Sequence, residues 1–447
     1  MTTIQLTNNK KTLTLHVQQM TIYKQAKIIE ATSKQNQCYS IIFYKNRFIN
    51  AKKTTSIRLQ SFLHRALING YKFTSYHPLT KALLSEEKSY PISTNNHMVS
   101  KLQDKFNDTE MLYVLAMFDN FLDQKKIQAL CKKTFYQYRR NGQLLKAFRI
   151  LINFLQVRPH DTFARDMLHH FDFQKYKDRY QKIDQITEKW SDPLYLEAVF
   201  FEQDYPKSII NPLLQQYHVD NREFDQLSLY FIKSSELDAV ANIDRLSEKL
   251  LSKEDRAHLW ELLLEKQPDS KEIINKLVKL NGYKQLLNHY LTHRQANIDL
   301  KILEEALEQV SSEDLIENYQ LLLESLMTSY KNDTVQLEKL LHITIRKLLH
   351  HLSLPDIMEA LPQTELPIIN KLKKMEQLTD NPDQQFALGE IYYDLEQYDQ
   401  AIACFEWEME LSPNNPEPIN YLYKSYLAKG DKTQANTYKQ LMVNIPS

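Results

Sequence analysis

The sequence predicts a mainly helical protein that begins with a small mixed α/β domain. Two observations predict helices. Only five of the 447 residues are glycine, and apolar side chains recur at helical spacing, for example over residues 300–310 and 315–326. A third observation, the alternation of apolar and polar side chains over residues 4–17, is typical of strands. We therefore expect an α-α solenoid of helical hairpins over residues 105–447, preceded by a small basic α/β domain over residues 1–100.

The strand signals lie in the first 100 residues. A β-hairpin is predicted over residues 4–17, and a second strand pair over residues 38–51 turns at Lys45–Asn46, because polar turn residues separate the apolar runs. Residues 54–69 are predicted to form a short helix, and residues 90–96 a loop. These elements together make the small mixed α/β domain.

The clearest helical hairpin lies at residues 382–415. Its small residues Gly389 and Ala401 fall where two helices would cross closely. Pro413 falls where the second helix should stop, because proline cannot continue the hydrogen-bond ladder. The other matching positions are Leu388, Tyr392, Tyr398 and Phe405. At these offsets the segment resembles a tetratricopeptide repeat, although Glu408 stands where that family prefers alanine.

Two further segments keep the same offsets. Residues 416–447 match at Leu422, Tyr426, Gly430 and Ala435. Residues 128–161 match at Tyr138, Gly142, Ala147, Leu151 and Pro159. Between residues 161 and 382 the register of the repeat is lost but the helical period is not. The resemblance therefore implies irregular helix pairs throughout this middle region.

The tetratricopeptide resemblance implies that the first helix of each repeat lines an inner groove that holds a protein or peptide. In the last two repeats the candidate partner-binding residues are Asp383, Phe386, Glu390, Tyr393, Asp394 and Lys424. This groove is acidic, so it favours a basic or aromatic peptide. In the first repeat they are Lys132, Tyr136, Arg139 and Arg140, which favour an anionic peptide. The other interpretation is that these charges only solvate a helix face.

Charge is distributed unevenly along the chain. The first 150 residues hold 24 Lys and Arg against 8 Asp and Glu, although the net charge of the whole chain is zero. Such asymmetry predicts either an anionic partner for the basic part or an attraction between the two parts of the chain. Basic and aromatic residues alternate in this part, as suits phosphate contacts and base stacking. The candidate nucleic-acid-binding residues are Lys45, Arg47, Lys52, Lys53, Arg58 and Arg65.

Three runs in the N-terminal segment resemble the competence transcription factor (ComK) family. They are AKIIEA at residues 26–31, TSIR at 55–58 and YHPLTKALLSEEKSYPIST at 76–94. The resemblance implies binding at the minor groove of AT-rich DNA. However, Ile57 stands where that family has cysteine, and the family's double proline is reduced to His77–Pro78. The alternative is a basic domain that docks on the acidic helices.

Several functional classes are disfavoured by composition. The five glycines are spaced too widely for a dinucleotide-binding or phosphate-binding loop. Cys38, Cys131 and Cys404 lie far apart, so they predict neither disulfides nor a metal site and favour a cytoplasmic protein. His169 and His170 would diverge by about 100 degrees on a helix and could not easily share an ion. No apolar run is long enough to cross a membrane. We therefore expect no catalytic residue, no metal and no cofactor.

The leading hypothesis is a cytoplasmic, non-enzymatic adaptor that binds a protein or peptide partner. The alternative is a transcriptional regulator that contacts DNA through residues 1–100 and uses the repeats as a sensor or oligomerisation arm. The sequence leaves the partner's identity and the oligomeric state open.

Overall fold

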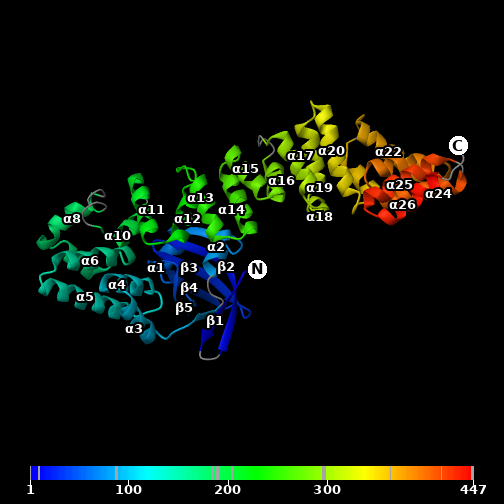
Figure 1. Cartoon of the computed structure of the whole chain (residues 1–447). Helices are drawn as coiled ribbons and strands as arrows, with labels where there is room; N and C mark the ends of the chain where they lie inside the picture. Colours follow the sequence, from blue (N-terminus) through cyan, green and yellow to red (C-terminus); the bar gives the residue numbers. More distant parts are fainter. Residues whose placement is uncertain are drawn as a thin grey trace. The chain divides into compact units, whose positions relative to one another are not determined.

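The computed structural model is mainly helical with a sheet at the N-terminal end, which confirms this part of the predicted fold class (Figure 1). It describes residues 2–8, 11–85, 89–182, 186, 191–202, 205–293, 298–362, 364–379, 381–413 and 415–443. The chain divides into two compact units, residues 1–259 and 260–447. Every described helix is too short or too polar to cross a lipid bilayer.

The strands of the first unit form one sheet. Their bounds are β1 Thr3–Asn8, β2 Lys11–Tyr23, β3 Ala26–Ser33, β4 Cys38–Tyr44, β5 Arg47–Lys53, β6 Tyr71–Thr74 and β7 Ser89–Pro91. Neighbours follow the order β5-β4-β3-β2-β1-β7, and β6 pairs with the second half of β2. All these pairs are antiparallel except β1 with β7. The two predicted strand pairs are thus confirmed as β1/β2 and β4/β5.

The turn between β4 and β5 lies where the sequence predicts it. Lys45 and Asn46 have φ angles of 46° and 69°. Two successive positive φ angles give a turn whose twist matches that of the flanking strands. This turn places Arg47 at the start of β5.

The two edge strands of the sheet, β5 and β7, approach each other. Asn50 of β5 accepts a hydrogen bond from the backbone nitrogen of Ser93 (3.1 Å) and donates one to the carbonyl oxygen of the same residue (2.9 Å). The rings of Phe48 and Tyr90 lie 5.0 Å apart on the same edges. The sheet therefore curls until side chains join its edges in the manner of a small barrel.

The first unit also contains helices. They are α1 Phe62–Asn69, α2 Pro78–Ser85, α3 Asn95–Lys105, α4 Asp108–Met117, α5 Gln124–Arg140, α6 Leu144–Val157, α7 Thr162–Leu168, α8 Gln174–Tyr180, α10 Pro193–Val199, α11 Ile210–Val219, α12 Glu223–Ile232 and α13 Val240–Leu250. Two 3-10 turns, η1 Phe171–Phe173 and η2 Lys207–Ile209, join some of them.

Two predictions about the N-terminal segment are wrong in detail. The helix predicted over residues 54–69 begins only at Phe62, because the Ser61 hydroxyl caps it by accepting a hydrogen bond from the His64 nitrogen (3.2 Å). The loop predicted over residues 90–96 instead contains the end of β7 and the start of α3. Tyr90 and Pro91 pair with β1, and the Thr94 side chain caps α3.

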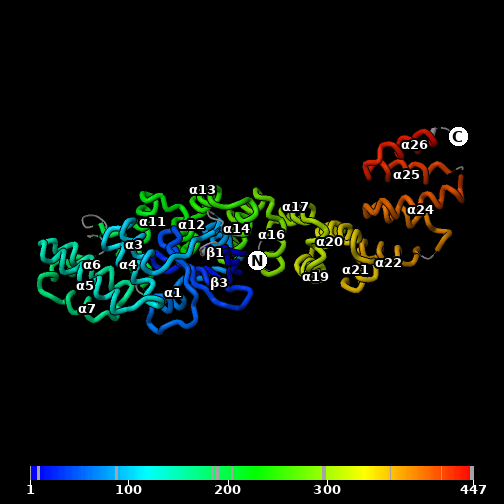
Figure 2. The backbone as a smooth tube through the Cα atoms, turned by 90° about the horizontal axis from the view of Figure 1, so that it is seen from below, coloured from blue at the N-terminus to red at the C-terminus, as the bar shows by residue number. Residues whose placement is uncertain are grey.

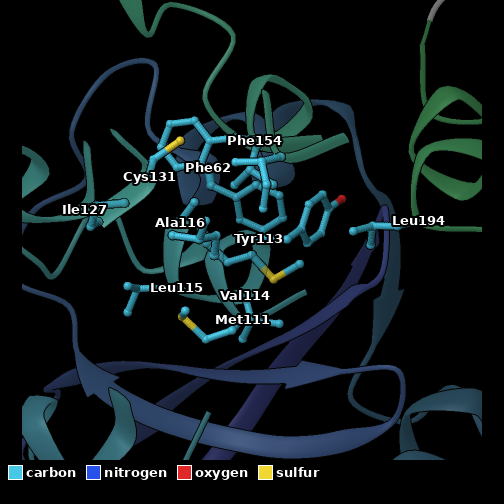
Figure 3. Packing of buried hydrophobic residues seen from close by; sticks show 14 of the residues in the cluster. Phe62, Met111, Tyr113, Val114, Leu115, Ala116, Ile127, Cys131, Phe154 and Leu194 are labelled. Carbon is cyan, nitrogen blue, oxygen red and sulfur yellow. The ribbon is translucent and has the colours of Figure 1, made fainter. Parts of the chain in front are cut away.

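The core of the first unit is centred on α4. Every residue from Met111 to Met117 is buried, so this helix is enclosed on all sides. Figure 3 shows Phe62 of α1, Tyr113 of α4 and Phe154 of α6 packed together within this core. Sheet residues such as Ile28 belong to the same apolar cluster. The sheet thus shares its core with helices that lie beyond residue 105.

The tip of the β2/β3 hairpin is buried, although hairpin tips usually face solvent. Lys24 and Gln25 form the turn, and they are 2% and 0% exposed. Gln25 donates a hydrogen bond to the Leu194 carbonyl (2.8 Å) and accepts one from the Tyr113 hydroxyl. Lys24 donates to the Gln156 carbonyl (2.8 Å). Because each polar group has a partner from a helix, the tip can enter the helical region without leaving hydrogen bonds unmade.

A neutral cluster of buried charges joins β3 to α10 and α12. Arg222 makes two 2.7 Å hydrogen bonds to Glu197 and one of 2.8 Å to Asp225, and Lys27 of β3 contacts Asp225. Asn46 also donates to Asp225 (3.0 Å). Burial alone would raise the pKa of Asp225, but Arg222 and Lys27 outweigh it and lower that pKa to about 2. These contacts fix α12 on the sheet.

The remaining helices belong mainly to the second unit. They are α14 Lys253–Lys266, α15 Lys271–Lys279, α16 Tyr283–Thr292, α17 Leu300–Gln309, α18 Ser312–Ile316, α19 Tyr319–Ser329, α20 Thr334–Leu348, α21 Leu354–Ala360, α22 Pro367–Thr379, α23 Gln385–Asp394, α24 Tyr398–Leu411, α25 Pro416–Lys429 and α26 Lys432–Val443, with a 3-10 turn η3 at Pro382–Gln384. The stripe over residues 315–326, predicted as one helix, is divided between α18 and α19.

One turn recurs in five helical hairpins. In α5/α6, α11/α12, α15/α16, α23/α24 and α25/α26, a residue with positive φ stands two positions before the second helix. These residues are Gly142, Asn221, Asn281, Glu396 and Gly430. In each turn the next nitrogen donates to the carbonyl four residues before the positive-φ residue, at 2.8–2.9 Å. This is the Schellman arrangement, in which a left-handed residue ends the first helix.

The same turn also occurs in the middle region, where the sequence does not keep the offsets of the repeat. The hairpins α11/α12 and α15/α16 use asparagine at the left-handed position, a residue that tolerates this conformation better than most. The three predicted repeats at 128–161, 382–415 and 416–447 all form helical hairpins. Residues 414 and 444–447 of those repeats lie outside the described residues.

Candidate functional site

The helices of the C-terminal hairpins cross closely where small residues were predicted. A Cβ atom on Gly389 of α23 would lie 2.7 Å from Cε1 of Phe405 on α24. This distance is shorter than non-bonded carbon–carbon contacts in proteins, so only glycine lets the two helices approach this closely. Ala401 of α24 is fully buried at the same crossing. The close crossing predicted at residues 389 and 401 is confirmed.

The following helices continue this packing, and α24, α25 and α26 run side by side (Figure 2). The rings of Tyr426 and Tyr438 stack with centroids 5.4 Å apart. Both hydroxyls donate hydrogen bonds to Glu406 of α24, at 3.2 and 3.1 Å. The stacked rings and the shared Glu406 acceptor hold α25 and α26 on α24.

One face of this array presents aromatic and charged side chains together. We call it the α23–α25 face and define it by Phe386, Glu390, Tyr393, Tyr421 and Lys424. The Tyr421 ring packs against Phe386 and Tyr393 with centroids 5.7 and 5.5 Å apart. Its hydroxyl donates to Glu390 (3.1 Å), and the Lys424 ammonium lies 5.2 Å from its ring centroid. Tyr421 therefore holds the predicted residues of two helices in one arrangement.

The environment of the α23–α25 face is acidic. Glu390 and Lys424 are exposed, and Asp383 and Glu417 are exposed nearby on η3 and α25. Partial burial and the hydrogen bond to Glu390 raise the pKa of Tyr421, so its hydroxyl keeps its proton at neutral pH. Asp394, at the end of α23, pairs with Lys371 of α22.

Tyr421 was not among the predicted site residues. The signal for it was present in the sequence, because Glu417, Tyr421 and Lys424 are spaced i, i+4 and i+7 and share one helix face. The tetratricopeptide offsets led to the polar positions and left out the aromatic side chain between them.

The candidate residues of α5 are divided between packing and solvent. Lys132 lies over the ring of Phe163, 5.0 Å from its centroid, and Arg139 donates to Asp172 (2.9 Å). Tyr136 is 41% exposed, and the Arg140 guanidinium donates to the Tyr136 carbonyl (3.2 Å). The structure therefore brings Tyr136 and Arg140 together at the surface, whereas Arg139 pairs with an acidic group.

The six basic residues predicted for nucleic-acid binding do not form one patch. Lys45 pairs with Glu110 of α4 (2.6 Å). The guanidinium of Arg58 donates to the Leu122 carbonyl (3.3 Å), and that of Arg65 to the Val157 carbonyl. These three side chains hold the N-terminal segment on its helices.

The other three, Arg47, Lys52 and Lys53, belong to β5. Lys52 donates to the Asn95 side chain (2.6 Å), and partial burial lowers its pKa. Arg47 and Lys53 are exposed. Only these two of the six remain without an ion pair or hydrogen bond among the described residues.

Ion pairs join the basic segment to acidic residues of the same unit. Lys24 pairs with Glu202 at 3.3 Å and Lys81 with Asp255 at 2.5 Å. Together with the Lys27 and Lys45 pairs described above, they connect residues 1–100 to residues that follow residue 105. Within the first unit, part of the charge asymmetry is therefore used for internal attraction.

The described residues hold no cluster of three His, Cys, Asp or Glu side chains that could bind a metal ion. His170 instead lies 3.2 Å from Asp172 and close to Arg139. Burial raises the pKa of the Cys131 thiol well above its ordinary value and that of Cys404 to about 11. Both thiols therefore stay protonated at neutral pH, which makes them poor nucleophiles.

No protein-family model matches the chain, and no curated protein matches it. The tetratricopeptide and competence-factor resemblances therefore rest on the residues quoted above.

Proposed function

We propose that the chain is a cytoplasmic, non-enzymatic adaptor built from tetratricopeptide-like hairpins. In this proposal the α23–α25 face binds an extended segment of a partner protein. The observation that carries the proposal is the arrangement around Tyr421, where aromatic rings from two helices lie half-exposed beside the carboxylate of Glu390. Aromatic residues in such positions supply most of the binding energy in many protein interfaces.

The chemistry of the partner segment follows from the charges on this face. Glu390, Asp383 and Glu417 are acidic, whereas Lys424 is the single base that defines the face. A segment with arginine or lysine beside an aromatic or aliphatic residue complements this pattern. The cation would lie over Tyr421 or pair with Glu390, and the apolar side chain would pack on Tyr393 and Phe386.

Selection of peptides on the full-length chain tests this proposal. A library of random 12-residue peptides is selected against the protein, and the enriched peptides are then titrated against variants. We expect basic peptides that contain an aromatic residue, with binding weakened roughly tenfold or more by Glu390→Lys and by Tyr393→Ala. Glu410→Lys, an equal charge change at an exposed position of α24, is the matched control and should leave binding within about twofold.

Enrichment of acidic or uncharged peptides would contradict the proposal. So would peptides that bind the Glu390→Lys variant as tightly as the original chain. Thermal melting of each variant, followed by circular dichroism, shows whether weaker binding comes from unfolding. We expect both variants to stay folded, because neither Glu390 nor Tyr393 is buried.

A second candidate function, a regulator that binds DNA through residues 1–100, is favoured by one observation. Arg47 and Lys53 lie exposed along β5 without an acidic partner among the described residues. Cations that are not neutralised within the protein are available for phosphate groups. This candidate predicts that both side chains contribute to binding of duplex DNA.

A further inference from the structure

A pocket of about 500 Å³ opens at the curled edge of the sheet, beside β5, β7 and α3. This volume lies within the range of roughly 300–1,000 Å³ that is typical of small-molecule sites. The pocket belongs wholly to the first unit and is separate from the α23–α25 face. Its lining residues come from β4, β5, β7, α2 and α3 and from the residues next to them.

Three basic side chains line this pocket. Arg47 begins β5, and Lys101 and Lys105 stand one turn apart on α3. All three are exposed, and none makes an ion pair or hydrogen bond within the described part of the chain. The described lining contains no Asp or Glu. Within the described lining, no carboxylate balances these three positive charges, which favours an anion over a cation or a neutral ligand.

Aromatic rings also line the pocket. Phe48 packs against Tyr90 at 5.0 Å and against Phe43 at 5.8 Å between ring centroids. Phe106, at the end of α3, packs edge-on against Tyr44 at 5.3 Å. Because Phe48 and Phe106 are only half-buried, each leaves part of its ring facing the pocket. Such surfaces accept a planar ring by stacking.

We propose that this pocket binds a nucleotide. The phosphate group contacts Arg47, Lys101 and Lys105, and the base packs against Phe48 and Phe106. The guanidinium of Arg47 can hold two phosphate oxygens at once, and Lys101 and Lys105 of α3 add further positive charge. The same chemistry occurs in a free mononucleotide and in the terminal nucleotide of a single strand. A duplex keeps its bases paired and cannot place one in a pocket of this size.

Calorimetric titration of the full-length chain tests the proposal. The probes are adenosine and cytidine 5′-monophosphate, adenosine, inorganic phosphate, a ten-nucleotide single strand and a 20-base-pair duplex. We expect the monophosphates to bind roughly tenfold or more tightly than either adenosine or inorganic phosphate, since only they use both the charges and the aromatic rings of the pocket. Tighter binding of the single strand would identify a strand end as the natural source, and tighter binding of the monophosphates a free nucleotide.

Substitutions locate the binding. Arg47→Ala and Lys101→Ala should each weaken nucleotide binding roughly tenfold, and Phe48→Leu should weaken it by a similar factor. Lys34→Ala is the control, because this exposed cation of the same unit does not line the pocket. It should change the affinity less than about twofold. Lys53→Ala separately tests the alternative surface along β5.

Three results would overturn the proposal. One is the absence of nucleotide binding at millimolar concentration. Another is equal affinity for inorganic phosphate and nucleotides, which would leave the aromatic rings without a role. The third is binding that depends on Lys53 but not on Lys101, with the duplex as the preferred probe. That result would assign the charges to a DNA-binding surface along β5 instead.

Discussion

In the first unit, the α11/α12 hairpin meets the sheet through Lys27, Arg222 and Asp225. In the second unit, α23 meets α24 through Gly389 and Phe405. Both hairpins are closed by the same Schellman turn, so the difference lies in what their faces carry. A buried charge needs its partner at a fixed place, whereas an apolar crossing needs only a matching shape.

This difference predicts where each unit should be sensitive to mutation. Loss of one partner from the charged cluster leaves another charge buried and unpaired. A substitution at the apolar crossing lowers stability only by the strain that remains after the neighbouring rings have moved. The three predictions below use this comparison, beginning with the largest expected effect.

Arg222→Met should destabilise the first unit most. The methionine side chain fills similar space but leaves Glu197 and Asp225 without the guanidinium that joins them. We expect a loss of about 3–5 kcal/mol in the free energy of unfolding. Hydrogen exchange of the full chain in increasing urea measures this loss separately in peptides from α10–α12 and from α23–α26.

Arg245→Met on α13 is the control for this prediction. Arg245 is exposed, so its replacement should change stability by no more than about 0.5 kcal/mol. An equal loss in both variants would mean that the buried cluster does not hold α12 on the sheet.

Asp119 should make the stability of the first unit depend on pH. It is 3% exposed, and its carboxylate accepts a hydrogen bond from the Phe62 nitrogen (3.0 Å). Burial raises its pKa from 3.8 to about 6. Between these values the folded chain holds a proton that the unfolded chain has released. This carboxyl therefore makes stability fall as pH rises from about 4 to 6, by up to about 3 kcal/mol.

Asp119→Asn keeps the hydrogen-bond acceptor for Phe62 and removes the titration. The difference in unfolding free energy between the two chains should therefore change in the variant's favour as pH rises through this window. Denaturant unfolding at several pH values measures it. A pH-independent difference for Asp119→Asn would contradict the assigned pKa.

Two glycine substitutions should separate crowding from backbone strain in the apolar hairpins. At Gly389 the new Cβ would overlap the Phe405 ring, and we expect a net loss of about 1–2 kcal/mol for Gly389→Ala after the gain in helix propensity. At Gly430 there is open space, but φ is 88°, so Gly430→Ala should lose about 1 kcal/mol. Thermal unfolding measures both effects.

A second substitution, from a larger to a smaller side chain, distinguishes crowding from backbone strain. Phe405→Leu should reduce the additional loss caused by Gly389→Ala, since it removes the ring that the new methyl group meets. The same change should not affect the loss caused by Gly430→Ala. Equal responses of both substitutions would show that the crossing is not crowded.

Local features of the fold could be read from the sequence where one residue type dictates the geometry. The Lys45–Asn46 turn and the small pair Gly389 and Ala401 are both of this kind. Each follows from backbone conformation or from side-chain size. The repeat offsets also led to Phe386, Glu390 and Tyr393, which the structure brings together around Tyr421.

Other features depend on contacts between residues far apart in the chain. Nothing near Lys27 shows that Asp225 will neutralise it, and the sequence of β3 gives no sign that this lysine is buried. Arg47 could be selected as a free cation, but Lys101 and Lys105 could not be placed beside it, because α3 lies in a segment whose start was predicted to be a loop. Likewise, no glycine or proline near Asn318 indicates that the 315–326 stripe is divided between α18 and α19.

The buried tip of the β2/β3 hairpin has a consequence for the order of events during synthesis. Lys24 and Gln25 find their partners at Gln156, Leu194 and Glu202. The side chains of this tip therefore cannot complete these hydrogen bonds until Glu202, which lies 178 residues after Lys24, has been synthesised. Contacts of such long sequence separation form late. Until then the tip of the nascent hairpin stays uncovered, and we expect a chaperone to bind the chain during this interval.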